Sequence, residues 1–410
     1  MRIALAYSGG LDTSIIIPWL METRPGSEVV AVCADVGQGD DLAQVRKKAL
    51  ASGAKDAVVL DLREPFVTRH IWPALKLGAV YQRRYLLGTA LARPVIAEGL
   101  ARVAAQIGAD AVAHGATGKG NDQVRFEAAM AALLPDMPVI APWREWPITS
   151  RTEAMAYAES HGVPVDQTPK EPWSRDANLW HISHEGGTLE DVTQAPPAGL
   201  LRMSVSPQAA PETVTEVDIA FTAGVPTALD GMCLPAITLL ERLNTLAGNA
   251  GVGTVDMVED RLVGVKSRGV YETPAGTVLH AALEALRSVA LDRRARRLLG
   301  ELADTYAELI YDGLYFTPSR QAIEAAGDIL MAPATGHVRV ALYKGNVQTR
   351  AVEASQPLYD THVASFDETG GGIVHADASG FMRLYTLPLR TAARAGRTGL
   401  QTENEPSRVG

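Results

Sequence analysis

The sequence is poor in the features that mark secreted and membrane-bound proteins. Its 410 residues include only two cysteines, Cys33 and Cys233, too few for a disulfide framework or a thiolate metal site, so we expect a reducing compartment. No apolar run has the length needed to span a bilayer, and no basic stretch precedes a long apolar segment at the N-terminus. We therefore expect a cytoplasmic protein with no membrane partner.

The charge balance argues against a third class, the nucleic-acid-binding proteins. The formal net charge is −9, and the chain lacks the basic excess that neutralises the phosphates of a nucleic acid. We expect small charged substrates and no nucleic-acid partner. With 47% hydrophobic and 21% charged residues, the chain can bury a sizeable core and is long enough for two domains.

The first glycine-rich loop of the chain matches neither the GxxxxGK[ST] motif nor the GxGxxG motif. Its sequence is AYSGGLDTS, residues 6–14, between a short apolar run and an amphipathic stretch. Gly9 and Gly10 allow a tight turn close to an anion, and free N–H groups at the start of the next helix attract phosphate. The segment predicts a loop that binds a nucleotide pyrophosphate group. The alternative is a strand-to-helix turn whose glycines serve geometry alone.

Apolar runs alternate with helical patterns over the first part of the chain. The runs RIALAY, EVVAVCADV, DAVVLDL, ADAVAHG and MPVIAPW begin at residues 2, 28, 56, 109 and 137. This alternation predicts an α/β fold over residues 1–165, a Rossmann-like parallel sheet with helices on both faces. Ligands of such sheets bind beyond the carboxyl ends of the strands, where Ser8, Asp35, Gln38 and Gly115 fall.

Beyond Pro164 the pattern predicts an α+β domain over residues 166–389, followed by a polar tail, residues 390–410, that we expect to be mobile. Alternating residues predict hairpins over 212–230 and 337–352. A helix is expected over 235–248, with Pro235 in its first turn and Gly248 as its C-terminal cap, and a long helical region over 279–311. Pro18 falls inside the first expected helix and should bend it.

Several longer segments, taken in order, are much more specific. The AYSGGLDTS loop has the SGGxDS order of the ATP pyrophosphatases, which cut ATP between its α- and β-phosphates. The chain also contains ADVGQG from residue 34, RYLLGTALARP from 84, HGATGKGNDQVRFE from 114, APWREW from 141, EPWSRDANLWHISHEGG from 171 and VEDRLVGVKSRGVYETPAGT from 258. Together these segments closely resemble the argininosuccinate synthase family of the N-type ATP pyrophosphatase superfamily, from Arg2 to about Leu389.

The resemblance implies an enzyme of arginine biosynthesis and the urea cycle that joins L-citrulline and L-aspartate. The family uses ATP, releases AMP and pyrophosphate, and passes through a citrullyl-adenylate. The resemblance also implies a nucleotide-binding ATP pyrophosphatase domain followed by a synthetase and oligomerisation domain, with Mg²⁺ on the phosphates and assembly as a homotetramer.

The family's functional residues carry over to matching positions of this sequence. Those for ATP are Ala6, Tyr7, Ser8, Gly9, Gly10, Leu11, Asp12, Thr13, Ser14, Ala34, Gly115, Ala116, Thr117, Gly118 and Lys119. Those for aspartate are Thr117, Asn121 and Asp122, and those for citrulline are Tyr85, Ala90, Asn121, Arg125, Ser174, Ser183, Glu259 and Tyr271.

The chemistry of these side chains agrees with the implied roles. Hydroxyl and amide groups can satisfy carboxylates, and Asp122 can accept an α-ammonium group. Arg125 lies one helical turn past Asn121, and its guanidinium group suits a substrate carboxylate. The alternative role for Arg125 is a surface ion pair. Adenylylation requires positioned reactants and neutralised phosphate charge, so we expect catalytic roles for Asp12, Asp122 and Arg125. The base that deprotonates aspartate stays open between His114 and Asp122, and the metal ligands are not predicted.

One position departs from the family. Its LLGTS segment reads LLGTA here, which places Ala90 where citrulline is expected. The lost hydroxyl costs about 0.5–1.5 kcal/mol of binding where the partner finds water. Ala90 also leaves room for a modified acceptor, so a related ligase that uses another ureido or guanidino compound is the main alternative.

Two other classes fit less well. A tRNA thiolase would require a reactive cysteine pair and a basic surface, and an ammonia-using synthetase would carry a glutaminase with a nucleophilic cysteine. Cys33 and Cys233 suit neither role. A degenerate relative that only binds ATP or an amino acid is a non-enzymatic alternative, against which the intact loops argue.

Overall fold

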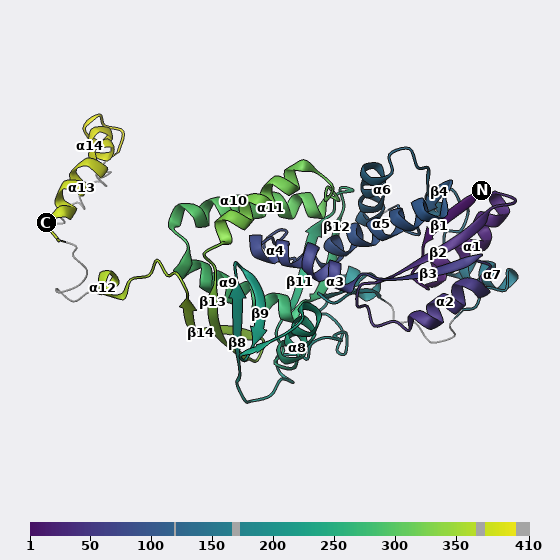
Figure 1. The fold of residues 1–410 in the computed structure, drawn as a ribbon, viewed down its shortest axis with the longest axis horizontal. Helices are drawn as coiled ribbons and strands as arrows, with labels where there is room; N and C mark the ends of the chain where they lie inside the picture. Colours follow the sequence, from purple (N-terminus) through teal and green to yellow (C-terminus); the bar gives the residue numbers. More distant parts are fainter. Residues whose placement is uncertain (119, 166–172, 366–373, 399–410) are drawn as a thin grey trace, which may run out of the picture. The chain divides into compact units, whose positions relative to one another are not determined.

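The computed structural model describes residues 1–118, 120–165, 173–365 and 374–398. The chain divides into two compact units, Met1–Pro357 and Leu358–Gly410. The larger unit contains three sheets, and its elements are labelled in Figure 1.

A five-stranded sheet in the order β3-β2-β1-β4-β5 forms the first part of this unit, and all its strand pairs are parallel. Its strands are β1 (Arg2–Ala6), β2 (Glu28–Asp35), β3 (Asp56–Asp61), β4 (Ala111–Ala113) and β5 (Val139–Ile140). Ile3 and Leu5 point to one face and Ala4 to the other, as the two-residue period of a strand requires. The predicted fold class is confirmed.

Helices cover both faces of the parallel sheet. They are α1 (Leu11–Thr23), α2 (Leu42–Ala51), α5 (Gly88–Ile107), α6 (Asn121–Leu133) and α7 (Arg151–Ser160). The cluster around Ile3 contains residues of α1 and α7, and the cluster around Ala4 contains residues of α5 and α6. The chain passes from β1 outward to β3 and then returns to β4 on the other side of β1, so a topological switch point lies between β1 and β4.

Antiparallel sheets form the rest of the larger unit. One has the order β11-β12-β7-β6, with β6 (Ser174–Ala177), β7 (Ile182–Glu185), β11 (Thr254–Asp260) and β12 (Lys266–Glu272). The other has the order β10-β9-β8-β13-β14, with β8 (Thr215–Thr222), β9 (Val225–Leu229), β10 (Met232–Cys233), β13 (Gly336–Tyr343) and β14 (Asn346–Ala354). Both predicted hairpins, β8–β9 and β13–β14, are therefore present.

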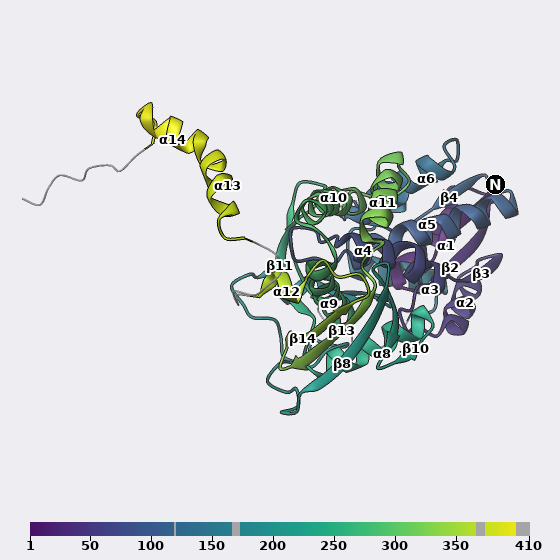
Figure 2. The same cartoon turned by 60° about the vertical axis from the view of Figure 1, so that its left-hand side comes forward.

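Further helices pack around these sheets. Between β3 and α5 lie the short α3 (Arg63–Pro65), a π-helical turn (Phe66–Ile71) and α4 (Trp72–Leu77). Later come α8 (Ala236–Asn249), α9 (Pro274–Ala290), α10 (Arg293–Tyr311) and α11 (Pro318–Met331), of which α10 and α11 lie side by side (Figure 2). Leu279, Leu283 and Leu286 of α9 are completely buried in the largest core cluster.

Three details differ from the sequence prediction. The expected long helix over 279–311 is two helices, because Leu291 is extended and Asp292 caps α10 through the N–H groups of Arg294 and Ala295. Pro235 is the N-cap of α8 rather than a first-turn residue. Gly248 lies inside α8, which ends at Asn249 with Ala250 as its C-cap. α1 contains Pro18, as expected.

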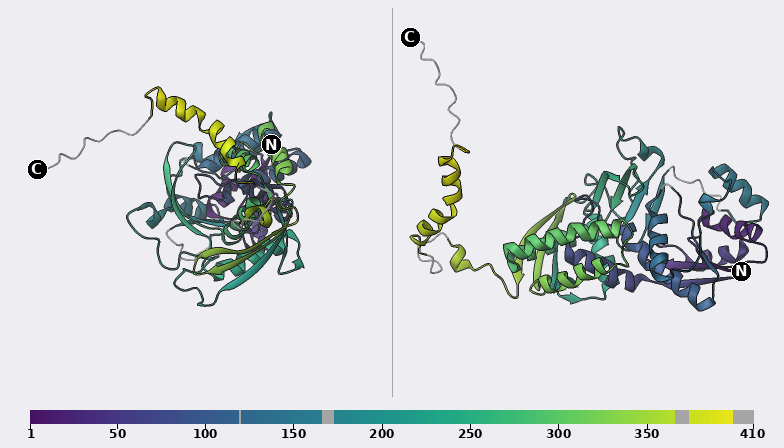
Figure 3. Two further views of the ribbon diagram at one scale, coloured as in Figure 1. Left: turned by 90° about the vertical axis from the view of Figure 1, so that its left-hand side faces the viewer. Right: turned by 90° about the horizontal axis from the view of Figure 1, so that it is seen from above.

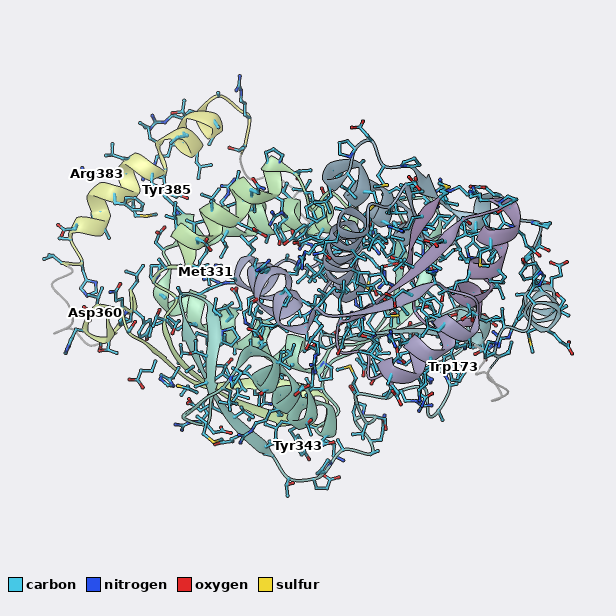
Figure 4. All side chains as sticks on the ribbon, turned by 45° about the vertical axis from the view of Figure 1, so that its right-hand side comes forward. Trp173, Met331, Tyr343, Asp360, Arg383 and Tyr385 are labelled. Carbon is cyan, nitrogen blue, oxygen red and sulfur yellow. The ribbon has the colours of Figure 1, made fainter. Side chains whose placement is uncertain are left out.

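The smaller unit contains the helices α12 (Thr361–Ala364), α13 (Asp377–Tyr385) and α14 (Leu387–Arg394), the last two consecutive (Figure 3). The residues past Leu389, where we expected a polar tail, begin as part of α14. Large apolar side chains of these helices are exposed, among them Phe381, Leu384, Tyr385 and Leu389. Figure 4 labels Arg383 and Tyr385 on α13, where the Tyr385 ring stacks on Phe381.

Length and hydropathy fall short of a membrane span in every helix of the described part of the chain. This finding agrees with the apolar runs of the sequence, which are short.

The position of Gly248 yields a stability prediction. A Cβ at Gly248 would overlap the backbone carbonyl oxygen of Met203, whereas a Cβ at Gly300, inside α10, would meet nothing. We expect Gly248→Ala to lower the free energy of unfolding by about 2 kcal/mol or more, since the backbone must move. Gly300→Ala should raise it by about 0.5–1 kcal/mol through helix propensity. Urea denaturation measures both, and equal shifts would contradict the packing described.

Candidate active site

Two cavities adjoin in the larger unit. The loop cavity, of about 520 Å³, lies at the carboxyl ends of β1 and β2 and is lined by residues 6–8, 10 and 13 among others. The sheet cavity, of about 300 Å³, lies over the β11-β12-β7-β6 sheet. The residues that line both are Arg93, Gly115, Ala116, Asp122, Arg175 and Asp176. The two cavities therefore share a wall, and ligands held in them would meet there.

The turn after β1 is held by its own hydroxyl groups. The Tyr7 hydroxyl lies 2.9 Å from Ser14 Oγ, and the Ser8 hydroxyl lies 3.2 Å from that of Thr13. Thr13 and Ser14 also donate to the carbonyl oxygen of Gly10, the N-cap of α1. These bonds fix the backbone at the start of α1, where free N–H groups and the helix dipole favour an anion.

A second loop approaches the first one closely. Gly115 follows β4, and a Cβ on it would come within 2.9 Å of Thr13 Cγ2. Glycine at this position therefore lets the loop after β4 lie against the start of α1. The same loop leads into α6, whose N-cap is Gly120. The loop after β4 and the start of α1 thus meet at the topological switch point of the sheet.

The floor of the sheet cavity is one face of the antiparallel sheet. In register, Ser174 lies opposite Glu185, Asp176 opposite Ser183, and Ser183 opposite Tyr271. Cross-strand partners and alternate residues of a strand share a face, which is why these side chains gather in one cavity. Gly269, opposite Glu185, leaves space for the Tyr271 ring. A Cβ on Gly269 would overlap the hydroxyl group of that ring.

Arginine side chains bind the carboxylates at the shared wall. Arg93 donates from Nε to Asp122 Oδ2 and from Nη2 to Asp176 Oδ2, each at 2.8 Å. Arg125 donates to Asp122 Oδ1 at 3.1 Å and to the carbonyl oxygen of Tyr311 at 3.0 Å. Burial alone would raise the pKa of Asp122, but Arg93 and Arg125 outweigh it and hold the pKa below its usual range.

The buried pair of His184 and Glu272 positions Arg175. Its Nε donates to His184 Nδ1 at 3.1 Å, and His184 Nε2 lies 2.7 Å from Glu272 Oε1. Because an arginine Nε is always a donor, Nδ1 of His184 accepts and its Nε2 carries the proton toward Glu272. Burial raises the pKa of Glu272, but His184 and the N–H groups of Arg202 and Ser204 outweigh it, so the pKa is lowered.

Glu259 and Tyr271 form the far side of the sheet cavity. Glu259 is 5% exposed, and burial raises its pKa. Its Oε2 atom has no hydrogen-bond partner within the described residues. A buried acceptor in a cavity requires a donor, which a ligand ammonium or amide group can supply.

The structure brings most of the predicted site residues together. Those in the sheet cavity are Tyr85, Thr117, Asn121, Asp122, Arg125, Ser174, Ser183, Glu259 and Tyr271. Those in the loop cavity are Ala6, Tyr7, Ser8, Gly10, Thr13, Ala34, Gly115 and Ala116. Gly9, Leu11, Asp12, Ser14, Ala90 and Gly118 line neither cavity. Lys119 lies outside the described residues.

Two of the predicted residues outside the cavities carried specific expectations. Asp12 is in the first turn of α1 and is exposed. Ala90, on α5, is 1% exposed and packs in the largest core cluster. The catalytic role of Asp12 and the contact of Ala90 with citrulline both stay predictions.

Sequence reasoning missed several residues of the sheet cavity, namely Thr89, Arg93, Arg175, Asp176, Glu185, Arg261 and Tyr311. Some had a signal in their spacing, since Asp176 and Glu185 follow Ser174 and Ser183 by two residues, and Thr89 and Arg93 are four residues apart. These spacings place side chains on one face of the strands β6 and β7 and of the helix α5, but strands over 174–185 were not expected. Arg261 and Tyr311 had none, because only the tertiary fold brings them here.

Comparison with known proteins decides the family. The family model described as "Arginosuccinate synthase N-terminal HUP domain" matches residues 2–164, and the model described as "Arginosuccinate synthase C-terminal domain" matches residues 173–392. The chain belongs to the argininosuccinate synthase family. The predicted family and the prediction of an ATP-using ligase are thereby confirmed.

Individual argininosuccinate synthases match nearly the whole chain. The enzyme of Moorella thermoacetica is 52% identical over 98% of this chain and 98% of its own length. That of Pelotomaculum thermopropionicum is 51% identical over 96% of this chain and 97% of its own. The chloroplastic enzyme of Arabidopsis thaliana is 50% identical over 96% of this chain and 79% of its own. The match therefore includes the residues of both cavities.

The double ion pair of Arg93 should contribute to the stability of this chain. The Arg93 side chain is 14% exposed, and its partners Asp122 and Asp176 are 30% and 32% exposed. We expect Arg93→Met to lower the free energy of unfolding by about 2–3 kcal/mol, since it removes a charged hydrogen bond from each of two partly buried carboxylates. Arg102→Met removes an exposed pair with Glu98 on the same helix and should cost under about 1 kcal/mol. Urea denaturation compares the variants, and similar losses would contradict a special role of Arg93.

Proposed function

We propose that this member of the family joins L-citrulline and L-aspartate to argininosuccinate, with ATP in the loop cavity and both amino acids in the sheet cavity. AMP and pyrophosphate are released, and a citrullyl-adenylate is the intermediate. The observation that supports this most strongly is the shared wall of the two cavities, because it lets the acceptor reach a nucleotide bound at the start of α1 and the loop after β4.

Citrulline binds, in this proposal, to the sheet face and to Arg125. The hydroxyls of Ser174 and Ser183 and the unpartnered oxygen of Glu259 supply hydrogen bonds, the last to the α-ammonium group. Arg125 supplies positive charge for a carboxylate, with its guanidinium 5.0 Å from the centre of the Tyr311 ring. Tyr85 and Tyr271, whose ring centres lie 4.6 Å apart, pack against each other and line the cavity beside the acceptor.

Aspartate binds beside it to Thr117, Asn121 and Asp122. Asp122 retains its negative charge because its pKa is lowered, so it can hold the substrate's ammonium group. Asn121 Oδ1 accepts from the N–H of Leu262, which leaves the amide nitrogen to donate to a carboxylate.

The first chemical step is attack of the citrulline ureido oxygen on the α-phosphorus of ATP, with pyrophosphate leaving. Held together at the shared wall, the two ligands react without an encounter step, which removes much of the entropic barrier. Arg93 and Arg175 place guanidinium groups at that wall, where negative charge rearranges during transfer. The oxygen needs no strong base, since the ureido group delocalises the charge that develops on it.

Mg²⁺ is proposed as the partner of the ATP phosphates, whose charge it would neutralise. Within the described residues no group of three His, Cys, Asp or Glu side chains is arranged to hold a metal ion. Mg²⁺ would therefore take most ligands from phosphate oxygens and water, with Asp12 of the first turn of α1 as a further candidate.

Assembly as a homotetramer and a cytoplasmic location are also proposed. The exposed apolar side chains of α13 and α14 support association, because such surfaces are normally covered by a partner. Light scattering on the purified chain measures the number of subunits.

Isotope transfer tests the reaction. Citrulline labelled with ¹⁸O in the ureido group should pass the label to AMP when ATP and aspartate are supplied, since the ureido oxygen becomes a phosphate oxygen. Mass spectrometry of AMP detects it. Formation of ADP and orthophosphate, or unlabelled AMP, would contradict the proposal. The same assay with other ureido and guanidino compounds tests whether Ala90 widens the choice of acceptor.

A further inference from the structure

Glu185 is a carboxylate of the sheet cavity to which no role has been given. It is the last residue of β7, and its side chain is 33% exposed. It shares a face with Ser183, two residues earlier, and lies directly opposite Ser174 in register. Glu185 therefore stands among the hydroxyl groups proposed to bind citrulline and reaches the open part of the cavity.

The charged groups around Glu185 come from four other segments of the chain. Arg261, in the turn between β11 and β12, donates a hydrogen bond to its Oε2 atom. Glu259 of β11, Asp122 of α6 and Asp176 of β6 repel its negative charge. Burial, aided by these carboxylates and opposed by Arg261, raises the pKa of Glu185 to about 7. A carboxylate with a pKa near the working pH can both accept and release a proton.

The other candidates for a base are occupied. Asp122 is bound by two guanidinium groups and has a lowered pKa, so it is a poor proton acceptor. His114 is 2% exposed and lines the loop cavity rather than the sheet cavity. Its Nδ1 accepts from the N–H of Ala116, and its Nε2 faces Glu127. The ring of His114 thus has structural partners on both sides.

We propose that Glu185 is the general base that removes a proton from the α-ammonium group of aspartate in the second chemical step. This inference rests on the proposed function. The face of β6 and β7 that carries Glu185 also carries the citrulline hydroxyls, and Asp122, the proposed partner of the aspartate ammonium group, is close enough to influence its charge.

The step balances as follows. The aspartate nitrogen gives one proton to the carboxylate of Glu185, and its freed electron pair forms a bond to the ureido carbon of the protonated adenylate. The bond between that carbon and the adenylyl oxygen breaks, and its electron pair leaves with AMP. The second proton released from the nitrogen goes to the phosphate of the departing AMP. The product is the guanidinium group of argininosuccinate, and Glu185 returns its proton to water.

Rapid-quench measurements on the full-length chain separate the two steps. With ATP and citrulline alone, pyrophosphate release reports adenylylation, and added radiolabelled aspartate reports formation of argininosuccinate. Glu185→Gln should slow argininosuccinate formation about 100-fold or more, as for loss of a general base, while pyrophosphate release changes less than about threefold. Glu190→Gln, an exposed glutamate on the same chain segment, is the matched control and should change neither step.

The pH dependence of the second step distinguishes a general base from a residue that only supports the structure, since loss of the latter would not change the pH profile. In the wild-type chain the second step should accelerate as pH rises through about 7, because Glu185 acts only when deprotonated. In Glu185→Gln this acceleration near pH 7 should disappear. The difference in rate between the wild-type chain and the variant should shrink at least tenfold by about pH 9.5, where the substrate amine loses its proton unaided. Glu185→Asp, which keeps a carboxylate, should retain part of the rate.

Each outcome has a distinct meaning. A constant deficit from about pH 6 to pH 9.5, or equal loss of both steps in a folded Glu185→Gln chain, would overturn the role of Glu185. Thermal unfolding of each variant shows whether it is folded, and Glu185→Asp provides the test if Glu185→Gln is not. Absence of citrulline-dependent pyrophosphate release in the wild-type chain would instead refute the proposed function.

Discussion

The guanidinium group of Arg93 is the interaction on which the site depends most. It binds carboxylates from two distant parts of the chain, Asp122 at the start of α6 and Asp176 on β6. One partner belongs to the parallel-sheet region and the other to the antiparallel sheet, so the ion pair joins the walls of both cavities. Partial burial makes the loss of Arg93 costly, because each carboxylate would lose a charged hydrogen bond in a place that bulk water reaches poorly.

The two regions contribute different chemistry to the shared wall. The parallel sheet brings the start of α1 and the loop after β4 together at its switch point, and the start of α1 gives backbone donors for an anion without a dedicated cation. The antiparallel sheet presents a face of hydroxyls and carboxylates, which suits polar amino acids. Arg93, Arg125, Arg175 and Arg261 balance Asp122, Asp176, Glu185 and Glu259 in the sheet cavity. This balance lets zwitterionic ligands bind without a large net charge.

Much of this could be predicted from the sequence, and the failures have physical reasons. The alternating apolar runs predict the parallel sheet, because the hydrophobic periods of strands and helices differ. The long motifs predict the family. Gly248 was expected to cap a helix, but its missing side chain instead admits the carbonyl group of Met203. The break at Leu291 is local and is marked only by the capping side chain of Asp292. Glu185 has a perturbed pKa only because tertiary contacts bury it near other carboxylates.

The central claim is that both ligands meet at the wall formed around Arg93. A crystal structure with citrulline and α,β-methylene ATP would test this claim most directly. The distance to measure joins the ureido oxygen of citrulline to the α-phosphorus. We expect about 3–3.5 Å, the separation of reacting atoms in a near-attack arrangement, with citrulline on the face that carries Ser174 and Ser183. Citrulline bound outside the sheet cavity, or a separation beyond about twice that value, would contradict the account.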